Sequence, residues 1–371
     1  MGRICVISSA GLAAFLIVGC TSGGTGTSGT GVEAQKALTS KFVSVSPAAG
    51  SRNVNGANQV TVTYSHPLPA GAELPTLTPA IPGTWQRRGD EAIFTPRTGF
   101  TQRTRVTVSI PVIGAAGSRV RTTSTTAKIV TFTTGSYSTL RLQELLAQLG
   151  YLPIAWTASA KSRPVNVTSP RQQLSAAYDP PAGSFSWDSN GYPSSLYSFW
   201  SQGTPNTLTK GALTGFEGDH GMTTDGNASP AVWSALLKAA AADQVNTYGY
   251  SYALVSQSAD PETITIWHDG KQAFRSVTNT GISVAPTPVG TFPVYERLPF
   301  QIMSGTNPDG SSYADPVQWV SYFSGGAAVH YFVRGTYGWP QSLGCVELPL
   351  DAAKQAYPLL PYGTLVTVLP E

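Results

Sequence analysis

The sequence predicts a mainly β, multidomain protein, and three observations favour that fold class. The chain has 371 residues, enough for two or three domains. Short runs that alternate apolar and polar residues fill its first and last thirds, and 38 glycines and 28 prolines punctuate them. The stretch between them, 138–242, has a helical period instead. A net charge of +3 without any basic run gives no reason to expect a nucleic-acid partner.

Residues 1–19 predict a signal peptide. Arg3 supplies a positive charge, and the mostly apolar stretch 4–18 is too short to span a bilayer as a stable helix. The stretch ends in Leu-Ile-Val-Gly-Cys20, which resembles the lipobox of bacterial lipoproteins. That resemblance implies cleavage before Cys20, lipidation of this residue, and an anchor on the outer face of the cytoplasmic membrane. An ordinary secretory signal is the alternative, and both interpretations place the mature chain outside the cytoplasm. Residues 20–40 begin with a lipidated Cys20 in this interpretation and continue as a flexible Gly/Ser/Thr-rich tether.

Residues 41–135 predict an immunoglobulin-like β-sandwich. Five runs alternate apolar and polar residues as half-buried strands do, with Pro and Gly between them. Several short strands within about 100 residues is typical of that fold. The Ser-Pro-Ala-Ala-Gly start and the segment from Trp85 to Pro96 resemble bacterial Ig-like surface modules. The five runs are 42–47, 59–64, 91–95, 105–110 and 128–133.

Residues 138–242 predict a mostly helical module. One helix follows Ser138, with leucines at helical spacing before Gly150, and another begins at Ser229 and Pro230. The combination Leu-Gly-Tyr-Leu-Pro, Gly-Ala-Leu-x-x-Phe, Asp-Gly and Val-Trp-x-Ala-Leu resembles the peptidoglycan-binding module found beside many wall enzymes. The leucines of the first helix are Leu142, Leu145, Leu146 and Leu149.

An insertion at about 160–206 interrupts this module and is rich in aromatic residues. Two interpretations stay open: an arm that contacts glycan or peptide, and a packing arm between domains, which aromatic side chains form more often. Asp219 and His220 are too few ligands for a metal site, and no metal is expected. The aromatic residues of the insertion are Phe185, Trp187, Tyr192, Tyr197, Phe199 and Trp200.

Residues 247–371 return to strand patterns, with a helix expected only at 350–357. They contain Cys345, the only cysteine beyond the first twenty residues, and His330 shortly before it. An imidazole close in space can take the thiol proton and then hold the thiolate. Alkylation of Cys345 is therefore expected to titrate near the imidazole range. Gly344 allows a sharp turn and frees backbone N–H groups to face an oxyanion.

The stretch from His330 to Val346 resembles the catalytic segment of the L,D-transpeptidases, the YkuD-type family of cell-wall enzymes. The family pattern is a histidine, a variable gap, then Ser/Thr-His-Gly-Cys and an apolar residue. A second family signature, Thr-Pro-x-Gly-x-Phe, is matched by residues 287–292. Leu343 departs from the pattern, because it replaces the family's histidine before Gly-Cys. The matching residues are His330, Ser342, Gly344, Cys345 and Val346.

The resemblance implies a C-terminal YkuD-like β-sandwich that acts on peptidoglycan stem peptides. Cys345 would form a thioester, His330 would act as base and then acid, and loss of a terminal D-Ala would give a 3→3 cross-link. Backbone N–H groups of residues 343–345 would stabilise the oxyanion, and the polar, Gly-rich stretch 300–317 would form a lid. The resemblance implies no cofactor and a carbapenem as covalent inhibitor. The expected substrate-binding residues are Leu343, Tyr313, Trp319 and Tyr331.

Two other functions stay open from the sequence. With water in place of the acceptor amine, the same thiol would make the chain an L,D-carboxypeptidase. A lipid-anchored peptidoglycan-binding protein with an inactive last domain would keep Cys345 as a buried apolar thiol and His330 as a core histidine. Leu343 is the main support for that inactive form. Trp319 has a core alternative of its own.

Overall fold

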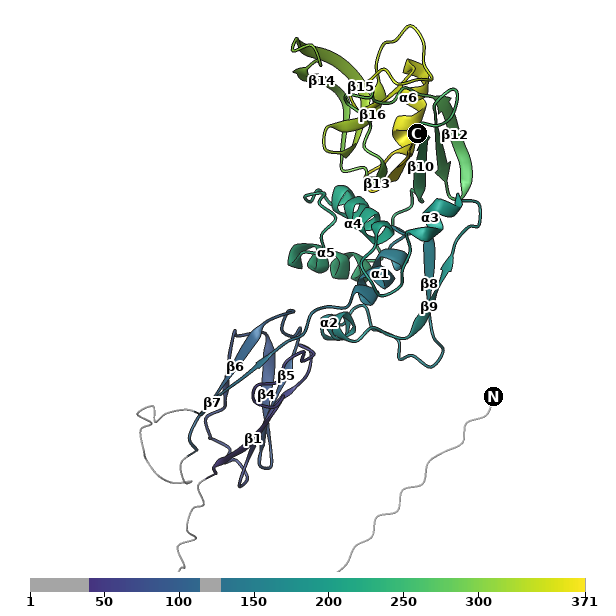
Figure 1. Ribbon diagram of the computed structural model, residues 1–371. Helices are drawn as coiled ribbons and strands as arrows, with labels where there is room; N and C mark the ends of the chain where they lie inside the picture. The colour runs from purple at the N-terminus through teal and green to yellow at the C-terminus, as the bar shows by residue number, and fades with distance from the viewer. Residues whose placement is uncertain (1–39, 114–127, 371) are drawn as a thin grey trace, which may run out of the picture.

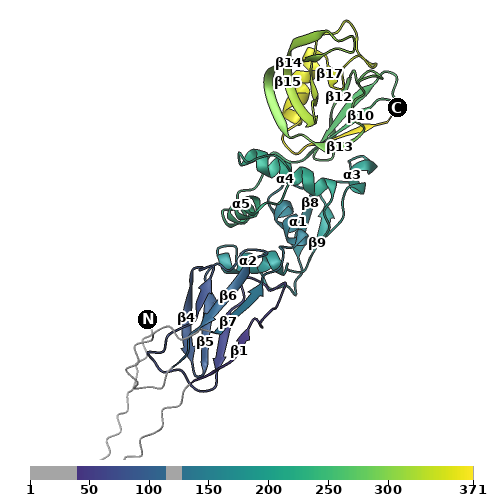
Figure 2. The same cartoon turned by 60° about the vertical axis from the view of Figure 1, so that its left-hand side comes forward.

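The computed structural model describes residues 40–113 and 128–370, which form three parts that follow one another in chain order. A β part at the N-terminal end, a central helical part and a C-terminal β part are strung out along the molecule (Figures 1 and 2). The predicted signal peptide, Cys20 and most of the tether lie outside the described residues. Among the helices of the described part, none has the length and apolar character to span a bilayer.

The N-terminal part consists of two antiparallel sheets around one core. The first sheet has the order β1-β2-β5-β4 and the second the order β3-β6-β7. The five predicted strands are present, and the alternating pattern places residues such as Val60, Val62 and Tyr64 inside. This arrangement is compatible with the immunoglobulin-like assignment, which stays a prediction. The strands are β1 (Phe42–Ser46), β2 (Val60–Tyr64), β3 (Thr76–Thr78), β4 (Gly83–Arg88), β5 (Glu91–Pro96), β6 (Arg105–Ile110) and β7 (Lys128–Thr133).

The central part contains five helices and a two-stranded antiparallel sheet. Helix α5 begins as predicted, because the Ser229 side chain accepts a hydrogen bond from Val232 N and Pro230 occupies the first turn. The second strand of this sheet and two of the helices lie within the predicted insertion at about 160–206, and the first strand precedes it. The elements are α1 (Thr139–Gln148), β8 (Ile154–Ala158), α2 (Pro170–Tyr178), β9 (Gly183–Trp187), α3 (Ser194–Ser198), α4 (Thr207–Asp219) and α5 (Pro230–Ala241).

The aromatic residues of the inserted segment pack into the core of the central part. Tyr192 is buried, and the other five pack against the same cluster as the helices. Edge-to-face pairs join Phe185 to Trp200 at 5.1 Å and Trp187 to Tyr197 at 4.5 Å between ring centroids. The structure therefore favours the packing interpretation of this segment over a glycan-contacting arm.

The C-terminal part is a sandwich of two sheets that enclose a core of aliphatic residues. One sheet has the order β12-β11-β10-β18-β13 and the other β14-β15-β16-β17. Helix α6 (Leu350–Ala356) confirms the predicted helix, with Asp351 in its first turn. The strands are β10 (Ser251–Ser256), β11 (Thr263–His268), β12 (Lys271–Val277), β13 (Gly290–Pro293), β14 (Glu296–Thr306), β15 (Ser312–Ser324), β16 (Ala327–Tyr331), β17 (Val346–Leu348) and β18 (Leu365–Leu369).

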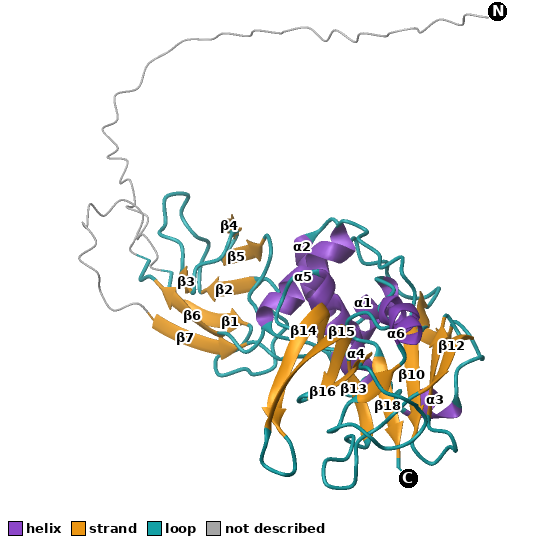
Figure 3. Cartoon of the chain, turned by 90° about the horizontal axis from the view of Figure 1, so that it is seen from above, coloured by secondary structure: helices purple, strands orange, loops and turns teal. Residues whose placement is uncertain are grey.

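The stretch 300–317 belongs to a long hairpin, whereas a loop was expected, and its role as a lid stays a prediction. Strands β14 and β15 pair as far as Thr306 and Ser312, and the hairpin projects from the sandwich (Figures 1 and 3). Only residues 307–311 form the turn, closed by a 2.7 Å hydrogen bond from Asn307 N to Ser311 O. The polar composition misled the prediction because both faces of a projecting hairpin are solvated, so its strands need few apolar residues.

The central part touches both of its neighbours through close contacts. Tyr178 of α2 donates a 2.8 Å hydrogen bond to Phe100 O of the N-terminal part. On the side of the C-terminal part, helix α4 packs so closely against the turn before β18 that no side chain fits between the two backbones. A Cβ on Gly363 would lie 2.3 Å from Gly211 O, so glycine is required there, also because Gly363 has φ +80°.

Candidate active site

His330 lies on β16 and Cys345 directly precedes the parallel neighbour β17, with both side chains on the same side of the sheet. In the register of β16 and β17, Val329 is opposite Val346 and His330 is opposite Glu347. Val329 and Val346 are buried in the core between the sheets. Because side chains alternate along a strand, His330, Glu347 and Cys345 all point away from that core. The sequence separates the two predicted catalytic residues, and the parallel pairing brings them to one face.

The backbone fixes the tautomer of His330. Its Nδ1 lies 2.9 Å from Tyr331 O, and a carbonyl oxygen can only accept, so Nδ1 carries the proton in neutral imidazole. Nε2 is then the free acceptor. The side chain is only 3% exposed, and burial lowers the pKa of His330, with Tyr331 O and Glu347 partly offsetting the shift and Arg334 adding to it. His330 is therefore held as a neutral base.

Cys345 is half-buried and makes only a weak polar contact, from Sγ to Gly326 O at 3.8 Å. Burial raises the pKa of the Cys345 thiol to about 11. The Ala328 backbone opposes this shift, and Glu347 adds to it. No hydrogen bond joins Cys345 to His330 within the described residues. Burial disfavours both charges, which favours a neutral thiol and a neutral imidazole in the resting site, and the expected thiolate–imidazolium pair stays a prediction.

The turn before Cys345 brings the two sequence signatures together. Ser342 Oγ donates a 2.6 Å hydrogen bond to Cys345 O, and Thr287 Oγ1 lies 3.4 Å from the same oxygen. Thr287 Oγ1 also accepts a 2.8 Å hydrogen bond from Gly281 N. Gly344 has φ +106°, a conformation that residues with a Cβ rarely adopt. Both hydroxyls thus fix the main chain of Cys345 rather than its sulfur.

One of the three N–H groups expected at the oxyanion is already engaged. Gly344 N donates to Ser342 Oγ at 3.2 Å. The N–H groups of Leu343 and Cys345 are the remaining candidates. The Leu343 side chain is 37% exposed beside the thiol, so the residue that replaces the family's histidine faces solvent.

Arg334 and Glu347 form an ion pair beside His330 that the sequence analysis missed. Arg334 donates from Nε and Nη2 to the two carboxylate oxygens at 2.8 Å each, and from Nη2 to Gln341 O at 3.0 Å. Glu347 is 4% exposed and accepts a further 3.3 Å hydrogen bond from Asn279 Nδ2. The pair joins Arg334, in the segment after β16, to Glu347 on β17, so it connects the part of the chain that follows His330 to the strand that follows Cys345. Its position two residues after Cys345 places Glu347 on the site's face, and that signal was available in the sequence.

Tyr322 is a second missed residue. Burial raises the pKa of its hydroxyl to about 12, and Cys345 is the next contributor, so the phenol and the thiol are electrostatic neighbours. The hydroxyl donates a 2.7 Å hydrogen bond to Gln301 Oε1 on β14. Tyr322 therefore links the long hairpin to the face that carries Cys345. Nothing in the sequence pattern singles it out.

Two of the expected substrate-binding side chains are not on this face. Trp319 lies at a bulge with φ +59° and packs on Tyr357 at 5.6 Å within the core cluster, so its core alternative is correct. The Tyr331 ring packs against the same cluster, and this residue serves the site through its carbonyl. Tyr313 lies far along the hairpin, opposite Gly305. Of the expected set, Leu343 is the one that adjoins Cys345.

The comparison with protein families decides what this part of the chain is. Residues 251–368 match YkuD, the L,D-transpeptidase catalytic domain. The matched stretch contains Cys345, His330 and both sequence signatures, and it begins with β10. This part of the chain therefore matches an L,D-transpeptidase catalytic domain of the YkuD family, while the N-terminal and central parts lie outside the match.

Solved structures of L,D-transpeptidases resemble the chain. One from Mycobacterium smegmatis has 15% identity and covers 90% of this chain and 100% of its own, with a TM-score of 0.30. L,D-transpeptidase 3 from Mycobacterium tuberculosis, solved with a faropenem-derived adduct, has 15% identity. The match covers 89% of this chain and 98% of that structure's chain, with a TM-score of 0.30. The catalytic domain of the E. faecium L,D-transpeptidase has 27% identity. The match covers 32% of this chain and 96% of that domain, also with a TM-score of 0.30. A search of curated proteins found no match.

Proposed function

We propose that the chain is an L,D-transpeptidase that cross-links peptidoglycan stem peptides through a thioester at Cys345. Cys345 Sγ attacks the carbonyl of the third residue of a donor tetrapeptide, while His330 Nε2 accepts the thiol proton. The tetrahedral intermediate collapses, the bond to the terminal D-Ala breaks, and His330 returns the proton to the leaving amine. An acceptor amine from another stem then attacks the thioester carbonyl, the C–S bond breaks, and His330 passes the amine proton to the leaving Cys345 sulfur, which restores the thiol and gives a 3→3 cross-link.

One observation carries this proposal: the family match includes a cysteine whose backbone is locked and whose sheet face holds a tautomer-fixed histidine. Thr287 and Ser342 hold the Cys345 carbonyl, and Tyr331 O orients His330 with Nε2 free. A general base must be neutral to accept a proton, and burial keeps His330 neutral. The proton then moves during the attack rather than before it.

The rest of the proposed function concerns location and inhibition. Peptidoglycan lies outside the cytoplasm, and the lipobox-like sequence at Cys20 would anchor the chain to the outer face of the membrane. The N-terminal part would serve as an immunoglobulin-like spacer, and the central part as a peptidoglycan-binding-like module. A carbapenem should acylate Cys345, because its strained lactam carbonyl is an acyl donor for the same nucleophile.

The test is to incubate the full chain with disaccharide-tetrapeptides and to analyse the products by mass spectrometry. Dimers with loss of D-Ala support transpeptidation, and tripeptide monomers would instead identify an L,D-carboxypeptidase. Unchanged substrate would identify an inactive peptidoglycan-binding protein. Cys345→Ala should abolish every product, and His330→Gln should come close to that result. His268→Gln is the matched control, since His268 lies on the other sheet.

A further inference from the structure

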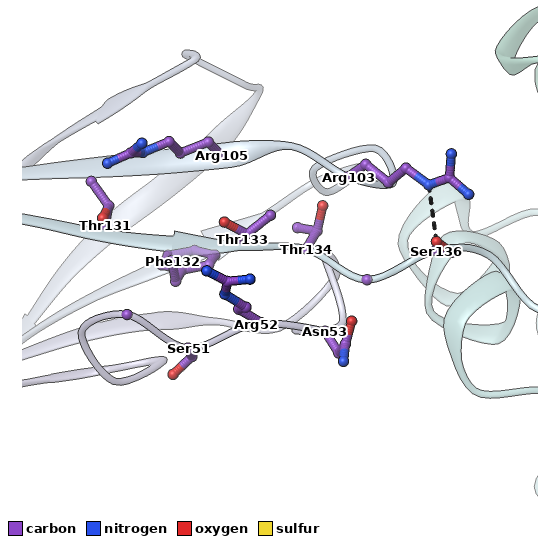
Figure 4. Close-up of a pocket in the computed structure, with 12 residues that line it drawn as sticks. Ser51, Arg52, Asn53, Arg103, Arg105, Thr131, Phe132, Thr133, Thr134 and Ser136 are labelled. Carbon is purple, nitrogen blue, oxygen red and sulfur yellow. Dashed lines mark hydrogen bonds between the residues drawn. The ribbon is translucent and has the colours of Figure 1, made fainter.

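A polar groove lies on the outer face of the second sheet of the N-terminal part. Strand β7 forms its floor, between β6 on one side and the segment 50–54 on the other. Thr131 and Thr133 point outward from β7, because they alternate with the buried Val130 and Phe132. The hollow has a volume of about 400 Å³ and is open to solvent (Figure 4). The N-terminal part that carries it lies at the other end of the molecule from the sandwich that carries Cys345 (Figure 1).

Three exposed arginines line this groove, and no carboxylate does. Arg52 comes from the segment 50–54, Arg105 lies opposite Thr133 on β6, and Arg103 precedes β6. None of the three has an ion-pair partner among residues 40–113 and 128–370. Arg103 donates from Nε to Ser136 Oγ at 3.0 Å. Three guanidinium groups without counter-charges attract an anion.

The arginines form a row rather than a cluster. Figure 4 shows Arg105, Arg52 and Arg103 at successive positions along β7, with their guanidinium groups apart from one another. A single small anion needs donors that converge, whereas a row suits charges repeated along a chain. The charge of the surrounding part agrees, since residues 40–113 and 128–135 contain eight Lys and Arg against three Asp and Glu. That excess favours a polyanion over an isolated anionic group.

The other residues that line the groove indicate which class of polyanion it would bind. Ser51, Asn53, Thr131 and Thr133 offer short hydroxyl and amide groups, which pair with sugar hydroxyls. Phe132 is the one aromatic residue among those that line the groove, and it is 2% exposed. Single-stranded nucleic acids rely on exposed aromatic rings that stack on bases, and this groove has none to offer. We propose that the groove binds an anionic polysaccharide, whose phosphate or carboxylate groups lie along the three arginines.

The experiment measures binding of the full chain to four immobilised polymers at about 50 and 200 mM salt. Poly(glycerol phosphate) carries phosphates on a polyol chain and polygalacturonate carries carboxylates, so they distinguish the two sources of charge. Dextran is the neutral control, and oligo(dT) tests for nucleic acid. The variant is Arg52→Gln with Arg105→Gln. The matched control, Arg88→Gln with Arg97→Gln, removes the same charge from exposed positions of the same part outside the groove.

We expect saturable binding of at least one of the two anionic polymers, weakened by salt, and no binding of dextran. The groove variant should bind about tenfold more weakly, since two exposed charge-assisted contacts are lost, and the control variant should keep its affinity. If both variants lost affinity for the anionic polymers equally, binding would depend on the net charge of the protein and not on the groove, and the proposal would be overturned. Absence of binding to both anionic polymers, or equal binding of oligo(dT), would overturn it too. Thermal melting of the two variants checks that both remain folded, and turnover of disaccharide-tetrapeptide should be unchanged in both.

Discussion

The pH dependence of Cys345 alkylation tests the resting state of the site. With the thiol pKa raised to about 11, the thiolate is about one part in 10⁴ at pH 7 and gains about tenfold per pH unit. Iodoacetamide reacts with the thiolate, so its rate at Cys345 should rise about tenfold per unit from pH 7 to pH 10. Peptide mapping by mass spectrometry at timed intervals gives the rate at this cysteine alone.

The same assay on His330→Gln separates two roles of the histidine. His330 is neutral and has no hydrogen bond to Cys345, so its loss should leave the alkylation profile nearly unchanged while turnover collapses. A rate that levels off below pH 8 in the wild type would refute the reasoning, because it would reveal a preformed thiolate. A shift of the profile by a pH unit or more in His330→Gln would do the same. His268→Gln is the control for both measurements.

Three further changes test other parts of the argument. Thr287→Val removes the acceptor of Gly281 N and a donor to Cys345 O, so the free energy of unfolding in urea should fall by about 1–3 kcal/mol and turnover should fall with it; unchanged stability would show that these contacts are dispensable. Glu347→Gln breaks a partly buried ion pair and should lower both Tm and the free energy of unfolding. The free energy should fall by about 2 kcal/mol, which is less than for a fully buried pair. A higher Tm in this variant would contradict the prediction. Cys20→Ala should release the chain from membranes in a fractionation experiment, since the lipid would be the anchor, and persistent membrane association would refute the lipoprotein prediction.

Much of the fold could be predicted because burial imposes alternation on strands. The runs around Val62 and Val108 have one buried face, and each is a strand in the structure. The projecting part of the hairpin of β14 and β15, residues 300–316, escaped prediction because none of its residues is fully buried. Trp319 escaped for another reason: a bulge with φ +59° turns its side chain to the core, and a bulge leaves no mark in the sequence.

The residues of the candidate site were chosen from the sequence and their catalytic roles stay predictions, while the electrostatics of the site could not be predicted. Cys345, His330 and Ser342 stand out as chemical types in a recognisable order. The direction of the two pKa shifts depends on how deeply the sheet face buries each group, and that depth is a property of the folded chain. The Arg334–Glu347 pair likewise depends on which strand β17 joins, and a parallel pairing across a long connection cannot be read from local pattern.

The geometry also bears on whether the proposed mechanism needs a histidine at position 343. A histidine beside the thiol would serve as the base only if no other imidazole were placed for that task. His330 already has Nδ1 committed to Tyr331 O and Nε2 free, which is the arrangement that proton transfer requires. The Leu343 side chain extends to solvent, while its main chain continues a turn held by Ser342 Oγ and by the φ of Gly344. We therefore expect position 343 to contribute only its backbone to the proposed mechanism, a role that leucine and histidine can fill equally.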